Sequence, residues 1–446
     1  MKSFFCLAAL LLCTILLQAQ KIKYESSFET AKAAALQQQK PLAVLLTMQV
    51  PAVPPDFMKG LNDKTVVEKF NTSFINYTVA REDSAASRKI IIDYKINRFP
   101  SFLFLDAKGG LLFNDPAFVS RAASLLETAD KAILASKEKS LSDYDSAFHA
   151  GSSEPAFLKA YILRRRTAGI TDNANLIEKY VTGIAVADLN NYIEVLFILK
   201  AGPLVDSSAY KLVNVNRRII DSIFKKEPLP DRVAMNNASI QNTMANAIAT
   251  KNMTRAQACA NFTRNSWTNN YAEGQKNWQL KMMQYFGGIK DTASYLRHAV
   301  AFYEQYYMRI SADSIRKKDS LDLETVRNRA RQNASVIASD STGRTFTFSV
   351  AKNAVATELN NAAWYFYTAA GNNNDYLMKA MLWSRRSIEL NPNPAFYDTY
   401  AHLLYRLQFF EEAESMQNKA IEAGKAAKTD TRLYQEEYKK IKAKTL

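Results

Sequence analysis

Strand-like segments occur only near the start of this 446-residue chain, and this limits its fold more than any other feature. Short apolar runs lie at residues 42–46, 74–80, 101–107 and 111–115, with helix-like stretches between the first three. The last two runs flank a turn that holds Gly109 and Gly110, which is typical of a hairpin. This order predicts a small α/β sandwich over residues 20–140.

After the linker GSSEP at 151–155, strand patterns nearly vanish. The chain then reads as successive helices of about three turns, with apolar residues at i, i+3 and i+4 and with Gly, Pro, Asn or Asp between them. Short helices need neighbours to cover their apolar faces, so we expect them to stack in pairs. The fold class predicted is α/β followed by all-α, with an all-helical region over 150–350.

The N-terminus has the pattern of a cleaved signal peptide. Lys2 precedes an apolar run at 4–17, and Ala19 closes a site for cleavage. Cleavage there predicts export to the periplasm or the extracellular space, with no membrane span in the mature chain; an uncleaved anchor is the alternative. Cys6 and Cys13 would leave with the peptide, so Cys259 would remain as a lone thiol that we expect to be buried.

Composition gives no support for catalysis or for nucleic-acid binding. The net charge is +15, but the basic residues lie in short, dispersed groups that are typical of solvated helix faces. His149, His298 and His402 are far apart and lack the spacing of metal ligands. There is no glycine-rich phosphate loop and no nucleophile elbow. We therefore predict no catalytic residue, no cofactor and no metal.

Residues 94–106, YKINRFPSFLFLD, are followed by the turn glycines Gly109 and Gly110. This ordered run resembles the thioredoxin family. The resemblance implies a cis bond before Pro100, and it implies that Phe99 and Pro100 form a ledge on which the backbone of an extended substrate pairs. A proline that ends a helix ahead of a strand would explain Pro100 alone, but not the whole run.

The same resemblance places the reactive CxxC pair of the family at Val50-Pro51-Ala52-Val53. Thiol exchange needs a thiolate and a second sulfur, and valine offers neither. Residues 20–258 contain no cysteine, and no acid lies between 40 and 55 to take the place of the family's buried carboxylate. We therefore predict a redox-inactive domain. Val50 and Val53, with Phe99 and Pro100, form a candidate apolar patch for a peptide; the alternative is that they only pack the loop onto the sheet.

Small and large apolar residues recur in the last hundred residues. Ala380 and Ala413 are 33 residues apart, and each lies in a segment with a similar pattern. The further pattern residues are Trp364 and Pro392 in the first segment, and Tyr397, Ala401, Leu404 and Ala420 in the second. These segments resemble tetratricopeptide repeats, over 355–425, with a capping helix over 428–446. Ser384 and Gln417 depart from the pattern, since an aromatic residue is usual at both positions.

The repeat resemblance implies a concave surface that grips peptides. The family's contact positions carry over to Tyr365, Asp398, His402, Tyr405 and Arg406. Together these features predict an exported binding or scaffolding protein whose partners are extended protein segments. The alternatives are an accessory to envelope thiol–disulfide enzymes and, third, a purely structural role.

Overall fold

The computed structural model describes residues 21–47, 55–81, 84–94, 96, 99–115, 121–315, 317, 320, 321, 324 and 354–446. The chain divides into two compact units, one up to Asn242 and the other from Thr243 to Leu446. The division falls within helix α12 (Leu229–Ala249). The first unit therefore contains the sheet and many of the helices that follow it.

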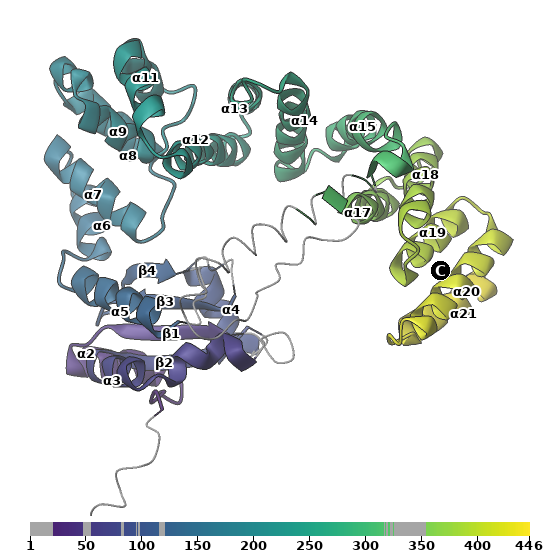
Figure 1. Ribbon diagram of the computed structural model, residues 1–446, viewed down its shortest axis with the longest axis horizontal. Coiled ribbons are helices and arrows are strands. Elements are labelled where there is room, and N and C mark those ends of the chain that lie inside the picture. Colours follow the sequence, from purple (N-terminus) through teal and green to yellow (C-terminus); the bar gives the residue numbers. More distant parts are fainter. Residues whose placement is uncertain are drawn as a thin grey trace, which may run out of the picture. The chain divides into compact units, whose positions relative to one another are not determined.

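The first unit begins with a four-stranded mixed sheet of order β2-β1-β3-β4 (Figure 1). The strands are β1 (Leu42–Thr47), β2 (Ile75–Ala80), β3 (Ser101–Leu105) and β4 (Leu111–Asp115). β1 pairs with β2 in parallel and with β3 in antiparallel, and β3 pairs with β4 in antiparallel. The predicted small α/β domain with a late hairpin is thus confirmed as a small mixed sheet.

Helices cover both faces of this sheet, because successive strand residues point to opposite faces. On one face, Leu42, Val44 and Leu46 pack with residues of α2 (Phe28–Gln38) and α4 (Ser84–Asp93). On the other face, Ala43 and Leu45 pack with α3 (Lys64–Ser73) and α5 (Ala122–Ser136). A 3₁₀ segment, η2 (Pro55–Asn62), precedes α3.

Five phenylalanine rings fill the layer between the sheet and α3. Ring centroids lie 5.4 Å apart for Phe70 and Phe102, 5.4 Å for Phe74 and Phe104, and 5.1 Å for Phe104 and Phe113. Pairs at this spacing stabilise a fold by about 0.5–1.5 kcal/mol each beyond the area that they bury. The apolar runs of the sequence therefore form a continuous aromatic core.

Side-chain caps fix where two of the helices that cover the sheet, α2 and α3, begin. The Ser27 hydroxyl accepts a hydrogen bond from the Thr30 backbone N at 3.1 Å, at the start of α2. The Asp63 carboxylate accepts hydrogen bonds from the backbone N of Thr65 at 2.9 Å and of Val66 at 3.3 Å, at the start of α3. These bonds, with that from the Thr65 hydroxyl as the largest cause, lower the pKa of Asp63. The caps satisfy donors that the first turn of a helix leaves unpaired.

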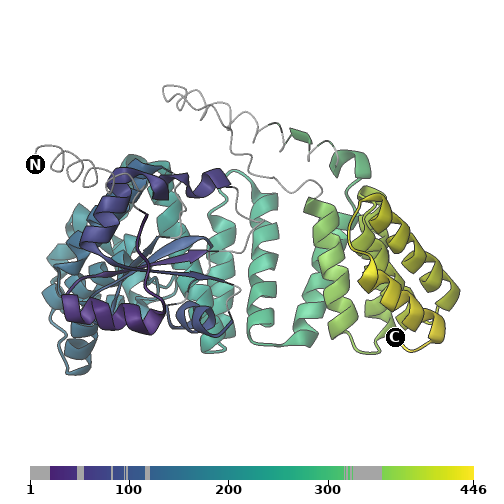
Figure 2. The same cartoon turned by 90° about the horizontal axis from the view of Figure 1, so that it is seen from below.

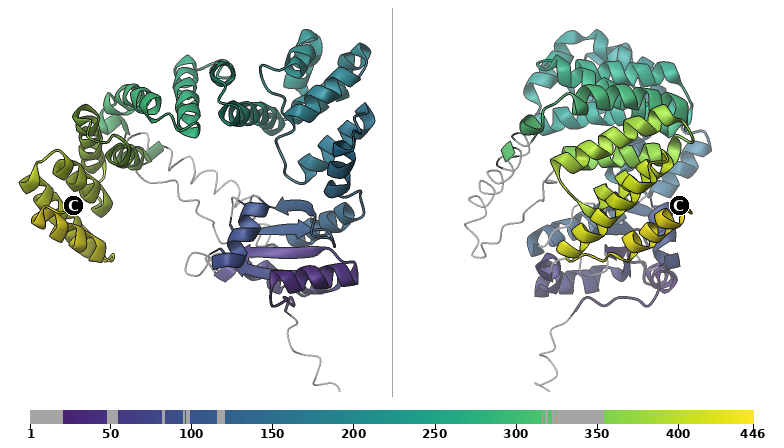
Figure 3. Two further views of the ribbon diagram at one scale, coloured as in Figure 1. Left: turned by 180° about the vertical axis from the view of Figure 1, so that it is seen from behind. Right: turned by 90° about the vertical axis from the view of Figure 1, so that its right-hand side faces the viewer.

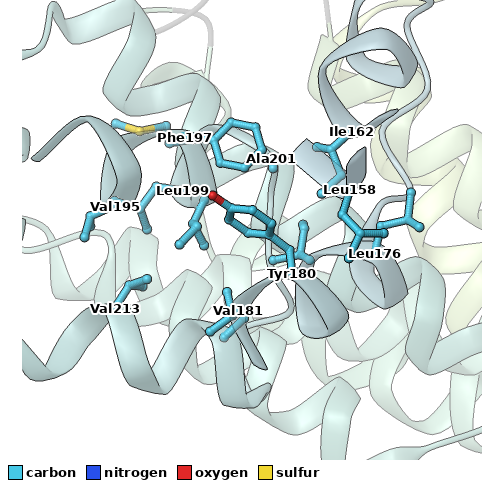
Figure 4. Packing of buried hydrophobic residues seen from close by; sticks show 14 of the residues in the cluster. Leu158, Ile162, Leu176, Tyr180, Val181, Val195, Phe197, Leu199, Ala201 and Val213 are labelled. Carbon is cyan, nitrogen blue, oxygen red and sulfur yellow. The ribbon is translucent and has the colours of Figure 1, made fainter. Parts of the chain in front are cut away.

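The rest of the first unit is helical, as predicted. It comprises α6 (Leu141–His149), α7 (Pro155–Thr167), α8 (Ala174–Gly183), η3 (Val186–Asn190), α9 (Tyr192–Lys200), α10 (Ser208–Val215), α11 (Arg217–Lys226) and the start of α12. Tyr180 lies at the centre of their core, among Leu158, Leu176 and Phe197 (Figure 4). Its hydroxyl donates to the Glu194 carboxylate, and burial is the main cause that raises the pKa of Tyr180.

Arg164 of α7 joins these helices to the sheet. Its buried guanidinium donates from Nη1 to the carbonyl oxygen of Leu112 at 2.9 Å and from Nη2 to that of Leu111 at 3.3 Å. β4 is an edge strand, and an uncovered edge offers unpaired backbone groups to other chains. Arg164 donates to two carbonyl groups of this edge strand, and α7 and β4 belong to one compact unit.

The described residues of the second unit contain helices and no strand. Its helices are α13 (Met253–Asn265), α14 (Tyr271–Gly288), α15 (Thr292–Tyr303), the π-helix η4 (Glu304–Met308), α17 (Ala354–Ala369), α18 (Asn374–Leu390), α19 (Pro394–Arg406), α20 (Phe410–Ala426) and α21 (Arg432–Ala443). Figure 2 shows helices of this unit, coloured green to yellow, side by side, and Figure 3 shows them from two other sides. α13 pairs with α14, α17 with α18 and α19 with α20, while α21 packs on α20. The predicted all-α region is confirmed.

The core of the second unit is built around Trp383, whose side chain is fully buried. The rings of Phe366 and Tyr303 lie 4.8 Å and 5.1 Å from the Trp383 ring, centroid to centroid. The indole N–H of Trp383 donates to Glu304 at 3.1 Å, so the one polar atom of this side chain is satisfied. Cys259 on α13 is also buried, as expected.

Among the helices of the described residues, none is long and apolar enough to cross a membrane.

Candidate functional site

The described residues between 94 and 110 form one connected structure around the turn between β3 and β4. The Asp106 carboxylate accepts hydrogen bonds from the backbone N of Lys108 and of Gly110, each at 2.8 Å. Gly109 has φ of +85°, a conformation that glycine adopts at no steric cost. A Cβ atom at Gly110 would collide with the Asp106 carboxylate. The Tyr94 hydroxyl donates to the Gly109 carbonyl at 3.0 Å, so the start of the motif is tied to its end.

Phe99 and Pro100 lie immediately before β3, and the peptide bond between them is cis, as the resemblance implies. Pro100 is buried and Phe99 is half-buried. The guanidinium carbon of Arg81 lies 5.4 Å from the centroid of the Phe99 ring, which places a cation beside the ring. Val50 and Val53 lie outside the described residues, so the patch that they were predicted to form with Phe99 and Pro100 stays a prediction.

The other five predicted contact residues lie in the second unit. Tyr365 is on α17, and Asp398, His402, Tyr405 and Arg406 are all on α19. His402 is buried, with an exposed fraction of only 5%, although its predicted place is on the surface of a groove. His402 therefore offers little surface for contact with a partner. Its role in this arrangement is to hold neighbouring side chains in place.

His402 lies between two aromatic rings and the carboxylates of Asp398 and Glu437. The Trp364 and Tyr367 rings of α17 each stand edge-on to the imidazole, with centroids 5.4 Å away. Nδ1 of His402 is 2.9 Å from the main-chain carbonyl oxygen of Asp398, to which a protonated Nδ1 donates. Nε2 is 3.5 Å from a carboxylate oxygen of Glu437 on α21. The ring therefore connects α17, α19 and α21.

Gln417 of α20 completes this arrangement. Its side-chain amide N is 2.7 Å from the Asp398 carboxylate and 3.2 Å from the carbonyl oxygen of Tyr434, to both of which it donates. Burial is the main cause that raises the pKa of Asp398, and the neighbouring His402 opposes this rise. A glutamine at this position, where the repeat pattern favours an aromatic residue, thus bridges α19 and α21 through its amide.

Arg406 lies on the same side of α19 as His402, against Tyr367. Its Nη1 donates to the Tyr367 carbonyl at 3.1 Å, and its guanidinium carbon lies 5.1 Å from the centroid of the Tyr367 ring. We call the six residues that meet here the His402 cluster. They are Trp364, Tyr367, Asp398, His402, Arg406 and Glu437.

The two other predicted residues contact different neighbours. The Tyr405 ring stands edge-on to Phe410 at 5.2 Å, and its hydroxyl accepts a hydrogen bond from the Leu446 backbone N at 3.2 Å. Tyr365 is exposed and stands edge-on to Tyr295 of α15 at 4.8 Å. The structure therefore brings Asp398, His402 and Arg406 together and places Tyr405 and Tyr365 outside their cluster.

Sequence reasoning missed three members of the cluster. Trp364 fits the repeat pattern as one of its large apolar residues, yet 40% of it is exposed. Tyr367 lies three residues after Trp364. This spacing, visible in the sequence, places both rings on one face of a helix. Glu437 could not be found from the repeat pattern, because it belongs to the capping helix.

The site combines an exposed aromatic surface on α17 with polar groups on α19 and α21. Trp364 and Tyr365 are exposed, while the Asp398 and Glu437 carboxylates keep side-chain exposures of 20% and 24%. Rings of this kind bind apolar side chains, and the carboxylates and Arg406 offer acceptors and donors to a peptide backbone. Within the described part of the chain, no group of three or more His, Cys, Asp or Glu residues is arranged to hold a metal ion.

Comparison of the chain with protein-family models, with curated proteins and with solved structures finds no match in any of the three.

Proposed function

We propose that this protein is an exported, non-catalytic binding or scaffolding protein that engages extended segments of other proteins. The observation that carries the proposal is the exposed pair Trp364 and Tyr365 on α17, of which Trp364 packs against His402. Two adjacent exposed aromatic residues on a helix of a repeat-like stack are typical of a surface that binds a partner.

An extended peptide is the partner that fits this surface best. A peptide backbone presents both N–H and C=O groups, and it therefore needs acceptors and donors within one site. Asp398 and Glu437 supply acceptors, and Arg406 supplies donors. The exposed rings of Trp364 and Tyr365 would receive the apolar side chains that alternate along the same peptide.

The helical pairs support the assignment of tetratricopeptide-like repeats. α17 with α18 and α19 with α20 form two successive pairs, and Ala380 and Ala413, which resemble the small residues of the repeat, are fully buried in them. Small residues let two helices approach closely. We assign α21 the role of the cap, because it packs on α20 and carries charged residues on its exposed side.

We assign the sheet domain a thioredoxin-like fold without thioredoxin chemistry. Its mixed sheet, with helices on both faces and a cis Phe99–Pro100 bond before β3, supports the fold. Residues 20–258 contain no cysteine, so this domain has no sulfur with which to exchange a disulfide. In this proposal the domain is retained for its shape and binds protein.

The second candidate is an accessory role in thiol–disulfide chemistry of the cell envelope. The position of Phe99 and Pro100 before β3, with Arg81 beside the ring, favours it, because this is the ledge that the family uses to bind a substrate chain. In that role the inert domain would dock a redox enzyme or a cysteine-bearing client.

The chain offers a matched pair of tryptophans for testing the first candidate. Trp364 on α17 is 40% exposed, and Trp267, which follows α13, is 43% exposed. Binding of the purified protein to an array of extended peptides from envelope proteins would be measured for Trp364→Ala and for Trp267→Ala. We expect Trp364→Ala to lose binding by about tenfold or more, as is usual for a central aromatic contact, and Trp267→Ala to bind as the parent chain does. Equal binding by both variants would remove the support for this surface.

A further inference from the structure

A second polar site lies elsewhere in the helical unit, where the π-helix η4 ends beside the last two turns of α18. A cavity of about 390 Å³ lies between them. Its walls include Arg309, Ile310, Leu382, Arg385, Arg386 and Glu389. No lining residue comes from α17 or α19, so this cavity is separate from the His402 cluster. π-helical turns are rare and are often found at functional sites.

The cavity has an excess of positive charge. Three arginines and one glutamate line it, which leaves two guanidinium charges without a matching carboxylate in its walls. Arg309 is exposed, and it forms no ion pair with another described residue of the chain. Guanidinium groups gathered in a cavity attract anions and bind carboxylates and phosphates through charge-assisted hydrogen bonds.

Glu389 shows how these arginines hold an oxyanion. One carboxylate oxygen of Glu389 lies 3.1 Å from Nη1 of Arg386, and the other lies 3.3 Å from Nε of Arg385. Arg386 is fixed in place by a second bond, from its Nη2 to the Ile310 carbonyl at 3.0 Å. A ligand oxyanion in the cavity would pair with Arg309 without displacing Glu389. It would compete with Glu389 for Arg385 and Arg386.

Apolar side chains stand beside the arginines. Ile310 and Leu382 line the same cavity and are 40% and 39% exposed, although large aliphatic side chains gain free energy when they are covered. A small inorganic anion would leave both uncovered. The volume lies within the range of about 300–1,000 Å³ that is usual for small-molecule sites.

We propose that this cavity binds an amphiphilic oxyanion, in which a carboxylate or phosphate group carries an apolar chain. The oxyanion lies between Arg309 and Arg385, and the apolar chain covers Ile310 and Leu382. This site goes beyond the proposed peptide-binding surface and does not depend on it, because the two share no residue.

Titration calorimetry of the full mature chain at low ionic strength tests the proposal with three probes. Octanoate supplies a carboxylate, octyl phosphate supplies a phosphate, and octanol is the uncharged control. We expect one or both anions to bind and octanol to bind at least about tenfold more weakly, since the arginines recognise charge. Binding of octanoate alone or octyl phosphate alone identifies the oxyanion. Equal binding of octanol, or no binding of either anion, would overturn the proposal.

Three variants separate this site from non-specific attraction to a basic protein. Arg309→Gln should weaken binding about fivefold, as expected for an exposed charge pair. Glu389→Gln should tighten it about threefold, because it removes the competing carboxylate. Arg297→Gln, which removes an exposed arginine of α15 outside the cavity, should leave it unchanged. An equal loss of anion affinity in Arg309→Gln and Arg297→Gln would contradict the site. Thermal unfolding of each variant confirms that it is folded.

Discussion

At the scale of single residues, the most informative positions are those where the chain departs from the family patterns that it resembles. Gln417 replaces an aromatic residue, and its buried amide donates to both Asp398 and the Tyr434 carbonyl. Such a bridge cannot be read from helical periodicity, because it depends on which helices become neighbours. The same holds for Glu437, which reaches His402 from the last helix.

The Gln417 bridge predicts a clear stability effect. Gln417→Leu keeps a similar side-chain volume but leaves Asp398 and the Tyr434 carbonyl without their donor, so we expect a loss of about 1–3 kcal/mol in the free energy of unfolding. All four tryptophans lie between 267 and 383, so tryptophan fluorescence during urea unfolding reports on the second unit. Asn418→Ala, on the exposed side of the same helix, is the control and should change stability by less than about 0.5 kcal/mol. Equal midpoints for the two variants would contradict the bridge.

Asp398 predicts a dependence of stability on pH. Its pKa is raised in the folded protein, mainly by burial, so the folded state holds the proton more tightly than the unfolded chain does. This contribution is present at low pH and is lost as the pH rises above the ordinary value of 3.8 and through the raised pKa. Asp398→Asn removes it while keeping an oxygen that accepts from Gln417. The difference in melting temperature between the variant and the parent chain should therefore shift in favour of the variant as pH rises. A constant difference from pH 3 to pH 7 would show that Asp398 does not carry this effect.

At the scale of elements, the sequence predicted the strands closely. The runs at 42–46 and 111–115 correspond to β1 and β4, and the run at 74–80 to β2, each with ends that differ by no more than one residue. The run at 101–107 is longer than β3, which ends at Leu105. The turn begins at Asp106, whose carboxylate accepts a hydrogen bond from the Lys108 backbone N. Strand positions follow from local apolar pattern, whereas the pairing of α7 with β4 through Arg164 depends on contacts distant in sequence.

The hydrogen bonds of Arg164 predict that α7 stabilises the edge strand β4. Arg164→Met leaves the Leu111 and Leu112 carbonyls without the Arg164 donor. We therefore expect the free energy of unfolding to fall by about 2 kcal/mol, with the largest local effect at β4. Hydrogen exchange of the β4 amides measures this, since exchange should become faster there than in the variant Arg166→Met. Arg166 lies on the same helix, and no hydrogen bond from its guanidinium is found among the described residues, so it is a matched control. Unchanged protection in Arg164→Met would mean that α7 does not stabilise the sheet edge.

At the scale of the whole molecule, the chain joins a small mixed sheet to a long series of helices, and the sequence indicated both parts. It did not indicate that the first compact unit extends to Asn242, whose side-chain amide donates to the carbonyls of Thr171 and Gly202, both distant in sequence. Cysteine placement, in contrast, is fully visible in the sequence. The only cysteine after residue 13 is Cys259, which is buried on α13 of the second unit.

This placement predicts that the protein does not catalyse disulfide reduction. In an insulin-reduction assay with dithiothreitol, the purified chain should react at the rate of buffer alone, because two sulfurs in one site are needed for thiol exchange. The double variant Val50→Cys with Val53→Cys tests whether the fold can support the chemistry, and we expect a rate above buffer but below that of a thioredoxin enzyme. Activity in the parent chain would contradict a redox-inactive domain.

In-cell photocrosslinking is the sharpest test of the proposal that the surface formed by α17 and α19 binds a protein partner. A photoreactive amino acid would replace Tyr365 on α17 or, as the control, Leu134, which is exposed on α5. We predict that position 365 captures a protein, that position 134 does not, and that the captured band weakens in Arg406→Gln but not in Trp267→Ala. Capture at 365 that equals capture at 134, or that is unaffected by Arg406→Gln, would contradict the claim.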